Sequence, residues 1–353
     1  MEIYVLDADI NIVGVFSTYE SIIWTDKFQE PGTFKATFIF SERMNQILVR
    51  GNLLYKTDEE QPGLITRKYL KLNKYGEQTI VIQGYMASRY MHQRIIWNKM
   101  VMKGTPEKLM RQMVNEQVIN PANADRKMDR IELGELQGYN ADEIEKQITY
   151  DNLQDALTAI AKTSGLGYRL RLDYNRKKLV FEVRKGVDRS IGTENPCIFD
   201  RRFGNVYTQE YSEDSTNHKN VCLVGGPGQD ESRVLETVGE AAGLDRYEMF
   251  YSAAGMSSKD ITAAELSGQL KQKGKEKLAS YYITAAFESK INQDKAMKYA
   301  LGDTVTCMDV SWGITVNTQV KAIQKGFSKK ERSVVITFGN EAPTLVDLIK
   351  AKE

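Results

Sequence analysis

The chain has 353 residues, a mass of 40.1 kDa and a formal net charge of +1, with 48 Lys and Arg against 47 Asp and Glu. This balance excludes a general attraction to nucleic acid or to a membrane surface. With 41% hydrophobic residues, the length predicts two or three domains. No stretch approaches the roughly 18 apolar residues of a membrane span. The acidic N-terminus lacks the features of a signal peptide, so we expect synthesis and folding in the cytoplasm.

Residues 1–92 have the pattern of an all-β unit. Residues 3–6 and 12–16 flank a polar turn and predict a hairpin, and residues 19–25 predict the next strand. In residues 33–40 apolar side chains alternate with polar ones, so we expect one buried face. A meander from Gly51 to Gly84 completes about seven strands, which would be enough to close a first small barrel.

Residues 93–196 change to a mixed pattern and predict an α+β middle domain. The run Thr105-Pro106-Glu107 supplies an N-cap, a proline at the first helical position and an acid in the first turn, so a helix should begin there. A second helix is expected over residues 151–163, with Gly165 as its stop. The remaining elements are a loop over residues 120–142 and a hairpin made of residues 168–172 and 178–183.

Residues 197–253 and 281–342 predict a second β-barrel, in which residues 205–213 should pair with residues 219–224 around a polar turn. Between these two parts, residues 254–280 predict a small helical insertion, because Thr262 and Glu265 have the spacing of a capping box. The second unit ends in a meander over residues 301–340, and residues 343–353 form a C-terminal tail.

The two meanders are similar to each other. Each begins at a glycine beside a polar residue, and each ends in a strand that runs into a glycine. We therefore predict an α+β fold, mainly β, with two similar antiparallel β-barrels around the middle domain. Chance is the alternative, because hairpins share turn chemistry in any case.

The residue patterns that carry enzyme chemistry are sparse. The two histidines, His92 and His218, lie outside any metal-binding or catalytic spacing, and three widely separated cysteines form no zinc motif and are expected to be buried. The glycine-rich residues 225–228 lack the Lys-Ser/Thr of a phosphate loop. Residues 142–145 include three acids, but their polar neighbours would not raise a carboxyl pKa for glycoside hydrolysis. We predict no catalytic residue, no metal site and no cofactor.

Several short motifs follow one another along the chain. They run from Glu20-Ser21 and Trp24 through a Gly-x-Phe sequence, a Gly-x-Asp-Arg sequence, and a Phe-Gly-Asn sequence to Leu-Gly-Asp and a closing Phe-Gly. In this order they resemble the hub proteins of phage tail tips and baseplates, including siphophage and prophage tail proteins and the hubs of tail-like bacteriocins. The matching positions are Trp24, Gly32, Phe34, Gly186, Asp188, Arg189, Phe203, Asn205, Gly302, Asp303 and Gly339.

The resemblance implies a homotrimeric ring in which each chain contributes two barrels. One pseudo-sixfold face would seat the hexameric tail tube or a distal tail protein, and the threefold face would hold a spike or tip protein. The tape-measure protein is a further candidate partner, and DNA would pass through the central channel without specific binding. This function places the protein at the distal end of a virion tail or tail-like particle.

Two alternatives remain open. One is a tail-associated peptidoglycan-degrading enzyme, and the other is the spike-core protein of a contractile secretion system. Many hub relatives continue into a hydrolase or fibre domain, whereas this sequence is expected to end after its second barrel at Glu353. No short-period repeat of the kind that builds a β-helical spike follows either.

Overall fold

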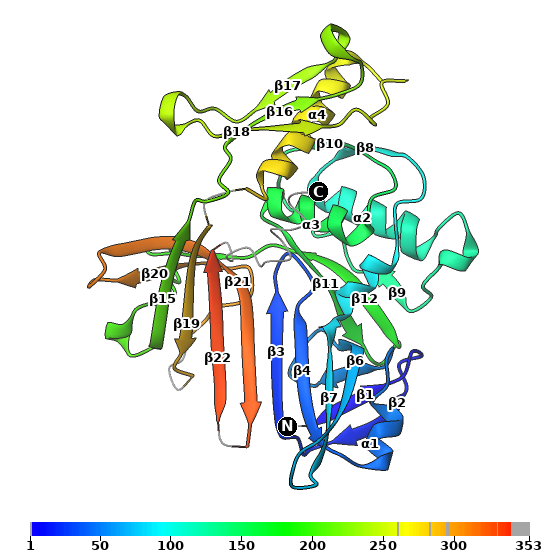
Figure 1. Cartoon of the computed structure of the whole chain (residues 1–353), viewed down its shortest axis with the longest axis vertical. Helices are drawn as coiled ribbons and strands as arrows, with labels where there is room; N and C mark the ends of the chain where they lie inside the picture. Colours follow the sequence, from blue (N-terminus) through cyan, green and yellow to red (C-terminus); the bar gives the residue numbers. More distant parts are fainter. Residues whose placement is uncertain (1, 260, 282–283, 294–296, 330, 340–353) are drawn as a thin grey trace.

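The computed structural model describes residues 2–259, 261–281, 284–293, 297–329 and 331–339. The fold is α+β and mainly β, as the sequence predicts. Figure 1 shows a large sheet in the lower part of the molecule, with a helical domain and a small domain above it. Among the described residues, no helix is long and apolar enough to cross a membrane. The predicted tail, residues 343–353, lies outside the described residues.

The first β-unit contains the strands that the sequence predicts. Ser41 caps a short helix, α1 (Glu42–Ile47), between the fourth and fifth strands. As the alternation predicts, Phe34, Ala36 and Phe38 are buried in the core of this unit. Its strands are β1 (Ile3–Leu6), β2 (Ile12–Phe16), β3 (Ser21–Lys27), β4 (Thr33–Ile39), β5 (Leu53–Lys56), β6 (Gly63–Leu72) and β7 (Gln78–Met86).

The second β-unit contains the predicted C-terminal meander. A separate core fills it, with Phe199, Phe287 and Phe338 fully buried. Its strands are β14 (Ile198–Phe199), β15 (Val206–Asp214), β19 (Thr284–Ile291), β20 (Thr304–Asp309), β21 (Ile314–Ser328) and β22 (Arg332–Gly339). Strand β13 (Asp188–Arg189), from the end of the middle segment, pairs with β20. The short 3-10 helix η4 (Arg201–Phe203) precedes β15.

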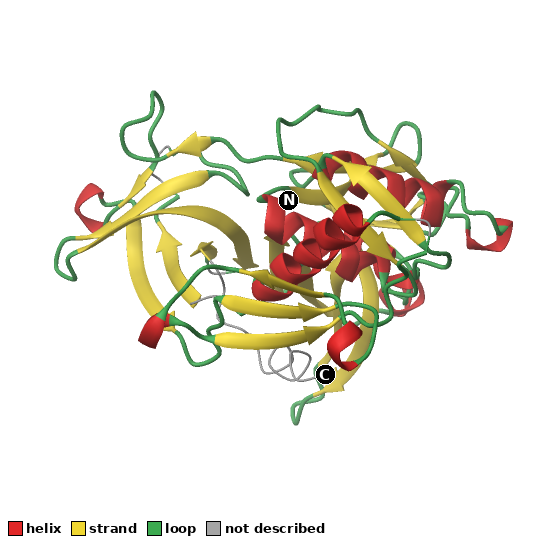
Figure 2. Cartoon of the chain, turned by 90° about the horizontal axis from the view of Figure 1, so that it is seen from above, coloured by secondary structure: helices red, strands yellow, loops and turns green. Residues whose placement is uncertain are grey.

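The strand pairing does not produce the two separate closed barrels that we expected. The two units instead join in one 14-stranded sheet, because β21 pairs antiparallel with β3 from Ala322–Lys27 to Ser328–Ser21. The order is β15-β19-β22-β21-β3-β4-β7-β6-β5-β1-β2, with β20 on the edge of β21. Figure 2 shows this sheet from above as two curved halves. We call the β3–β21 pairing the seam.

The middle domain lies over the seam and contains both predicted helices. Helix α2 (Pro106–Val114) begins after Thr105, and α3 (Leu153–Ser164) ends at Gly165, whose φ of 70° is the left-handed conformation of a C-cap. The predicted hairpin is β11 (Gly167–Asp173) with β12 (Lys178–Arg184). Three short strands were not predicted: β8 (Met100–Gly104), β9 (Ile131–Leu133) and β10 (Ile144–Ile148). The 3-10 helices η1 (Ala87–Gln93) and η3 (Ala124–Arg126) and the π-helix η2 (Asn115–Ile119) complete this part of the chain.

A small domain replaces the predicted helical insertion. Helix α4 (Ala263–Leu278) begins with the expected capping box, but it packs on a separate three-stranded sheet. The predicted pairing of residues 205–213 with 219–224 is wrong, since β15 pairs with β19. The apolar strand at residues 221–225 packs instead against the buried leucines of α4. The small domain consists of β16 (Val221–Gly225), β17 (Leu235–Val238), β18 (Glu248–Ser252), α4 and the turns η5 (Asp230–Ser232) and η6 (Gly243–Asp245).

Candidate functional site

The first group of motif residues packs together beside the seam. Trp24 is fully buried, and the centroid of its ring lies 5.5 Å from that of Phe34 on the neighbouring strand. A Cβ atom at Gly32 would lie 2.0 Å from the carbonyl oxygen of Thr25, so no larger residue fits there without a shift. These three motif residues hold β3 and β4 in close contact.

A second group of motif residues joins the end of the middle domain to the second unit. Asp303 is buried and accepts hydrogen bonds from Arg189 Nε at 2.8 Å, from the Val187 amide at 2.8 Å and from the Ala300 amide at 2.9 Å. Gly186 lies against Gly302, because a Cβ atom on Gly186 would be 1.8 Å from the Gly302 carbonyl oxygen. The structure therefore brings together four of the predicted positions, which lie more than a hundred residues apart in the sequence.

The other motif positions lie apart from these two groups. Asp188 is exposed; hydrogen bonding with the Ser190 side chain, and then with the Ser190 amide, lowers the pKa of its carboxyl. Asn205 links its own loop, accepting from the Asp200 amide and donating to the Ile198 carbonyl oxygen. Phe203 also matches the motif, but its side chain is exposed and does not pack in the core. Gly339 ends β22 with a φ of 76°.

Phe28 connects the two groups, although the sequence analysis did not single it out. Its ring is buried and lies 2.2 Å from where a Cβ atom on Gly302 would stand. A Cβ atom on Gly167 of the middle domain would lie 2.6 Å from the same ring. The Phe28 amide also donates to the Lys321 carbonyl oxygen at 2.9 Å. The Phe28 side chain is thus in contact with both β-units and the middle domain. In the sequence, the two glycines that leave space for its ring were the signal that could have indicated this contact.

Buried charges also gather at the seam. Glu59 accepts from Lys56 Nζ at 3.0 Å and from Lys325 Nζ at 2.8 Å, and Lys56 is fully buried. Asp26 lies nearby on β3; burial, then the negative charge of Glu59, raises the pKa of its carboxyl to about 7. Arg184 and Lys325 oppose this rise in pKa. The sequence analysis missed this network, since its members come from four separate segments.

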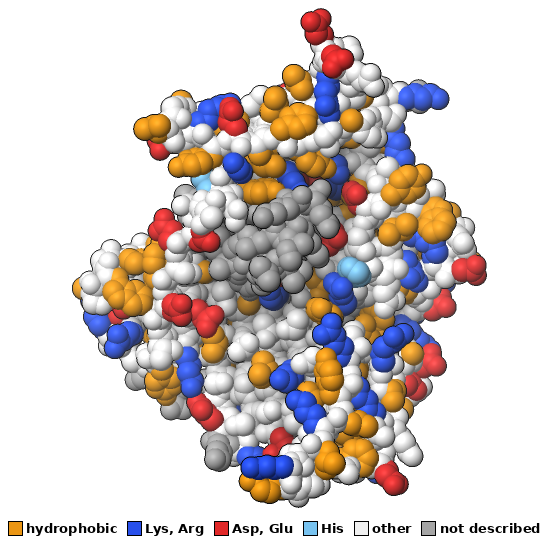
Figure 3. Space-filling model, in the orientation of Figure 1, with side chains coloured by type: hydrophobic (Ala, Val, Ile, Leu, Met, Phe, Trp, Pro, Cys, Tyr) orange, Lys and Arg blue, Asp and Glu red, His pale blue; other side chains and the backbone are white. Residues whose placement is uncertain are grey.

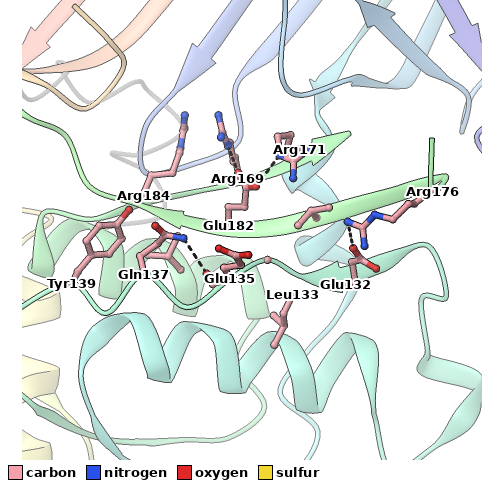
Figure 4. Close-up of a pocket in the computed structure, with 13 residues that line it drawn as sticks. Glu132, Leu133, Glu135, Gln137, Tyr139, Arg169, Arg171, Arg176, Glu182 and Arg184 are labelled. Atoms are coloured by element: carbon pink, nitrogen blue, oxygen red, sulfur yellow. Dashed lines mark hydrogen bonds and ion pairs between the residues drawn. The ribbon is translucent and has the colours of Figure 1, made fainter. Parts of the chain in front are cut away.

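A polar cavity of about 600 Å³ lies beside this network in the middle domain. Figure 4 shows Arg169, Arg171 and Arg184 projecting from one face of the β11–β12 hairpin. Glu182 accepts from Arg169 Nε and from Arg171 Nε, each at 2.7 Å. The Nε and Nη2 atoms of Arg184 are buried without a hydrogen-bond partner among the described residues, and burial lowers the pKa of this guanidinium to about 10. These two donors form the edge of a guanidinium that pairs with oxyanions in other proteins.

The small domain is attached to the middle domain by a buried ion pair. Lys146 Nζ on β10 lies 2.6 Å from Glu276 Oε1 on α4, and both side chains are almost inaccessible to solvent. Burial lowers the pKa of Lys146, although the charge of Glu276 opposes this effect. The side-chain amide of Gln147 donates to the Ser257 carbonyl oxygen and accepts from the Ser257 backbone amide.

The sequence analysis considered the histidines, the cysteines and an acidic run as possible enzyme residues. No group of three or more His, Cys, Asp or Glu side chains that could hold a metal ion occurs among them. All three cysteines are buried and unpaired, as predicted, and burial raises the pKa of Cys197 to about 11. Glu145 of the acidic run forms an ion pair with Lys103 at 2.7 Å. Figure 3 shows charged side chains of both signs scattered over this face, with hydrophobic ones gathered on the small domain.

Comparisons with known proteins agree with this architecture. The model of the siphovirus ReqiPepy6 Gp37-like protein family matches residues 2–340. No curated protein matches the sequence.

Three solved structures share the fold at low sequence identity. A tail protein from Neisseria meningitidis MC58 has a TM-score of 0.60 and 12% identity, covering 96% of both chains. The 43 kDa tail protein of prophage MuSo2 from Shewanella oneidensis has a TM-score of 0.58 and 12% identity, covering 96% of this chain and 98% of its own. Prophage tail protein gp18 from Listeria monocytogenes EGD-e has a TM-score of 0.57 and 13% identity, covering 100% of this chain and 98% of its own.

These matches confirm the resemblance to siphophage and prophage tail proteins that the motif order predicts. Since the family model covers nearly the whole sequence, the chain belongs to the siphovirus ReqiPepy6 Gp37-like protein family.

Proposed function

We propose that this protein is a structural hub at the distal end of a phage tail or tail-like particle. Membership of a siphovirus family and a fold shared with three phage or bacterial tail proteins over nearly the whole chain support a structural role in a tail. The observation that carries the proposal is the seam, which joins two β-units side by side in one sheet. Three such chains in a ring would present six β-units to a hexameric tube above them.

The proposed hub is a homotrimer. Its pseudo-sixfold face would bind the tail tube or a distal tail protein, and its threefold face would bind a spike or tip protein. The tape-measure protein would be a further neighbour, and DNA would pass through the channel without specific binding. For the domain division we propose β-units over residues 1–92 and over residues 197–219 with 281–342. The middle domain at 93–196, apart from β13, and a small domain at 221–278 would lie outside the ring of strands, which the separate sheets of the other strands support.

Solution mass is the first test of this proposal. Three chains of 40.1 kDa give about 120 kDa, which light scattering separates clearly from a monomer. We expect a particle of that mass, seen as a ring in negative stain, and binding to purified tail tube protein. A monomer at all accessible concentrations, with no binding to tube or spike proteins, would overturn the hub.

We propose no enzymatic role. The contacts described above hold domains together, and the matching family and solved structures are those of tail proteins, which supports this proposal. The check is a turnover assay on purified peptidoglycan, with a known cell-wall hydrolase as a positive control. Release of soluble fragments by this chain would contradict the structural assignment.

A further inference from the structure

The second β-unit repeats the strand order of the first. The order β15-β19-β22-β21-β20 corresponds to β3-β4-β7-β6-β5. The pairing register is irregular at the same place in both units, between Ile65 and Arg67 in β6 and between Val320 and Ala322 in β21. Strand β6 is therefore the equivalent of β21, and its residues can be aligned with those of β21 through this irregularity.

An aromatic pair gives a second, independent alignment. Trp24 on β3 is the cross-strand partner of Phe34, and Tyr211 on β15 is the cross-strand partner of Phe287. Their ring centroids are 5.5 Å and 4.9 Å apart, respectively. Strand β15 is therefore the equivalent of β3, and Tyr211 stands where Trp24 stands in the first unit.

One of the two equivalent edges is paired within the chain, and the other is not. Residues 322–328 of β21 pair with β3 at the seam. The equivalent edge of β6, residues 67–72, has no strand on it among the described residues, and β15 is paired only with β19. Figure 1 shows β6 and β15 on opposite sides of the molecule. Open edges with unpaired backbone groups are templates for another strand.

The seam predicts the register in which these edges would meet. Lys325 lies opposite Trp24, and Lys325 is the third residue after Ala322, where the irregularity ends. Leu70 holds that place in β6, because it is the third residue after Arg67. Since Tyr211 is the equivalent of Trp24, Leu70 would lie opposite Tyr211.

We propose that the outer edge of β6 pairs antiparallel with β15 of a second copy of this chain, with Leu70 opposite Tyr211. This register was derived without reference to charge, yet it places every basic residue of the edge opposite an acid. The resulting pairs are Arg67 with Asp214, Lys68 with Glu213 and Lys71 with Glu210.

In the single chain these residues have few side-chain contacts: Glu213 accepts from the Tyr211 hydroxyl and Asp214 from the Thr216 amide. Among the described residues, Arg67, Lys71, Glu210 and Asp214 form no ion pair, whereas Lys68 already donates to the Asn45 carbonyl oxygen. Cross-strand pairs of opposite charge stabilise a sheet, and like charges destabilise it. Leu70, which is 58% exposed, would be covered by the aromatic ring of the partner's strand.

This inference rests on the proposed hub and names its contact between chains. The two edges are different surfaces, so the contact is head-to-tail, and repetition around an axis closes a ring. The seam inside each chain and the β6–β15 contact between chains would then alternate around one continuous sheet.

Charge reversal tests the predicted register. We expect Arg67→Asp and Asp214→Arg each to raise the concentration needed for trimer formation by about tenfold or more, because three interfaces change at once. The chain that carries both substitutions restores opposite charges at every interface and should form trimers like the wild type. Lys35→Asp is the matched control, since Lys35 is an exposed residue of β4, which is paired on both sides. Circular dichroism and thermal unfolding of each monomer confirm folding.

Disulfide trapping gives a second readout that needs no stable trimer. Oxidation of Leu70→Cys/Tyr211→Cys should yield a covalent trimer on a non-reducing gel, because directly opposite residues are within disulfide reach. The control Leu70→Cys/Glu210→Cys places the second thiol on the other face of β15 and should cross-link poorly. A wild-type trimer that is unaffected by charge reversal and not trapped overturns this pairing and leaves the hub intact. A monomer that is never trapped at high concentration overturns both.

Discussion

Asp303 and Arg189 form an ion pair, 2.8 Å between Oδ2 and Nε, that ties the end of the middle domain to the second β-unit. Asp303 is 2% exposed and accepts two further hydrogen bonds from backbone amides. We expect Asp303→Asn to lower the free energy of unfolding by about 2–3 kcal/mol, because Arg189 and an amide lose a charged acceptor. Urea unfolding followed by circular dichroism measures the change.

The neighbouring Asp188 supplies the control for this substitution. Its carboxylate is exposed and accepts a hydrogen bond from Ser190 in its own loop, so Asp188→Asn should cost clearly less than Asp303→Asn. Equal losses for the two variants would show that the Asp303–Arg189 contact does not hold the domains together.

Gly186 has no space for a side chain. A Cβ atom would lie 1.8 Å from the Gly302 carbonyl oxygen, and the obstacle is backbone that cannot rotate away. We expect Gly186→Ala to lower the free energy of unfolding by about 2 kcal/mol or more. Gly255→Ala should change it by no more than about 0.5 kcal/mol, because no atom lies within 4 Å of a Cβ at that position. A melting temperature unchanged by Gly186→Ala would show that the two backbones are not in close contact.

Asp26 should make stability depend on pH. Burial and then Glu59 raise the pKa of its carboxyl to about 7 in the folded protein, above the value of about 4 in an unfolded chain. The folded state therefore binds the proton more tightly, and this contribution to stability is lost as the pH rises from about 4 through 7. Asp26→Asn removes the effect, so its stability relative to wild type should increase between pH 5 and pH 8, by at most roughly 3 kcal/mol.

Urea unfolding of both proteins at the two pH values measures this difference. Asp188→Asn is again the control, because contacts with Ser190 lower the pKa of Asp188, so that its carboxyl stays ionised and its difference from wild type should be constant over this pH range. A constant difference between Asp26→Asn and wild type across this range would mean that Asp26 does not titrate there.

Lys146 and Glu276 should determine how firmly the small domain is attached. Glu276→Gln leaves the buried ammonium group of Lys146 without its counter-charge, and we expect the attachment to weaken by about 3 kcal/mol. Hydrogen exchange should then accelerate in α4 and β10 while the large sheet stays protected. Glu248→Gln breaks an exposed pair with Arg246 and should leave exchange in α4 unchanged. Equal protection in both variants would contradict this role of the buried pair.

Most of the local elements could be predicted from the sequence. Alternation identified the face of β4 that carries Phe34 and Phe38, and capping residues located the starts of α2 and α4. The positions of Gly186, Gly302 and Asp303 were recognised from motifs, although their mutual contacts were not. The strands β8, β9 and β10 were missed because they are short and mix polar with apolar residues.

The sequence by itself determined which segments are strands and helices and which side of each is apolar, because these properties depend on neighbours a few residues away. Only the tertiary structure decided which strands are partners. Alternation marks a face but not the strand beside it, so the pairing of β15 with β19, and of β3 with β21, had no local signal. The same pairing brings Asp26, Glu59 and Lys325 together, and their buried charges act on one another only because the fold removes water from between them.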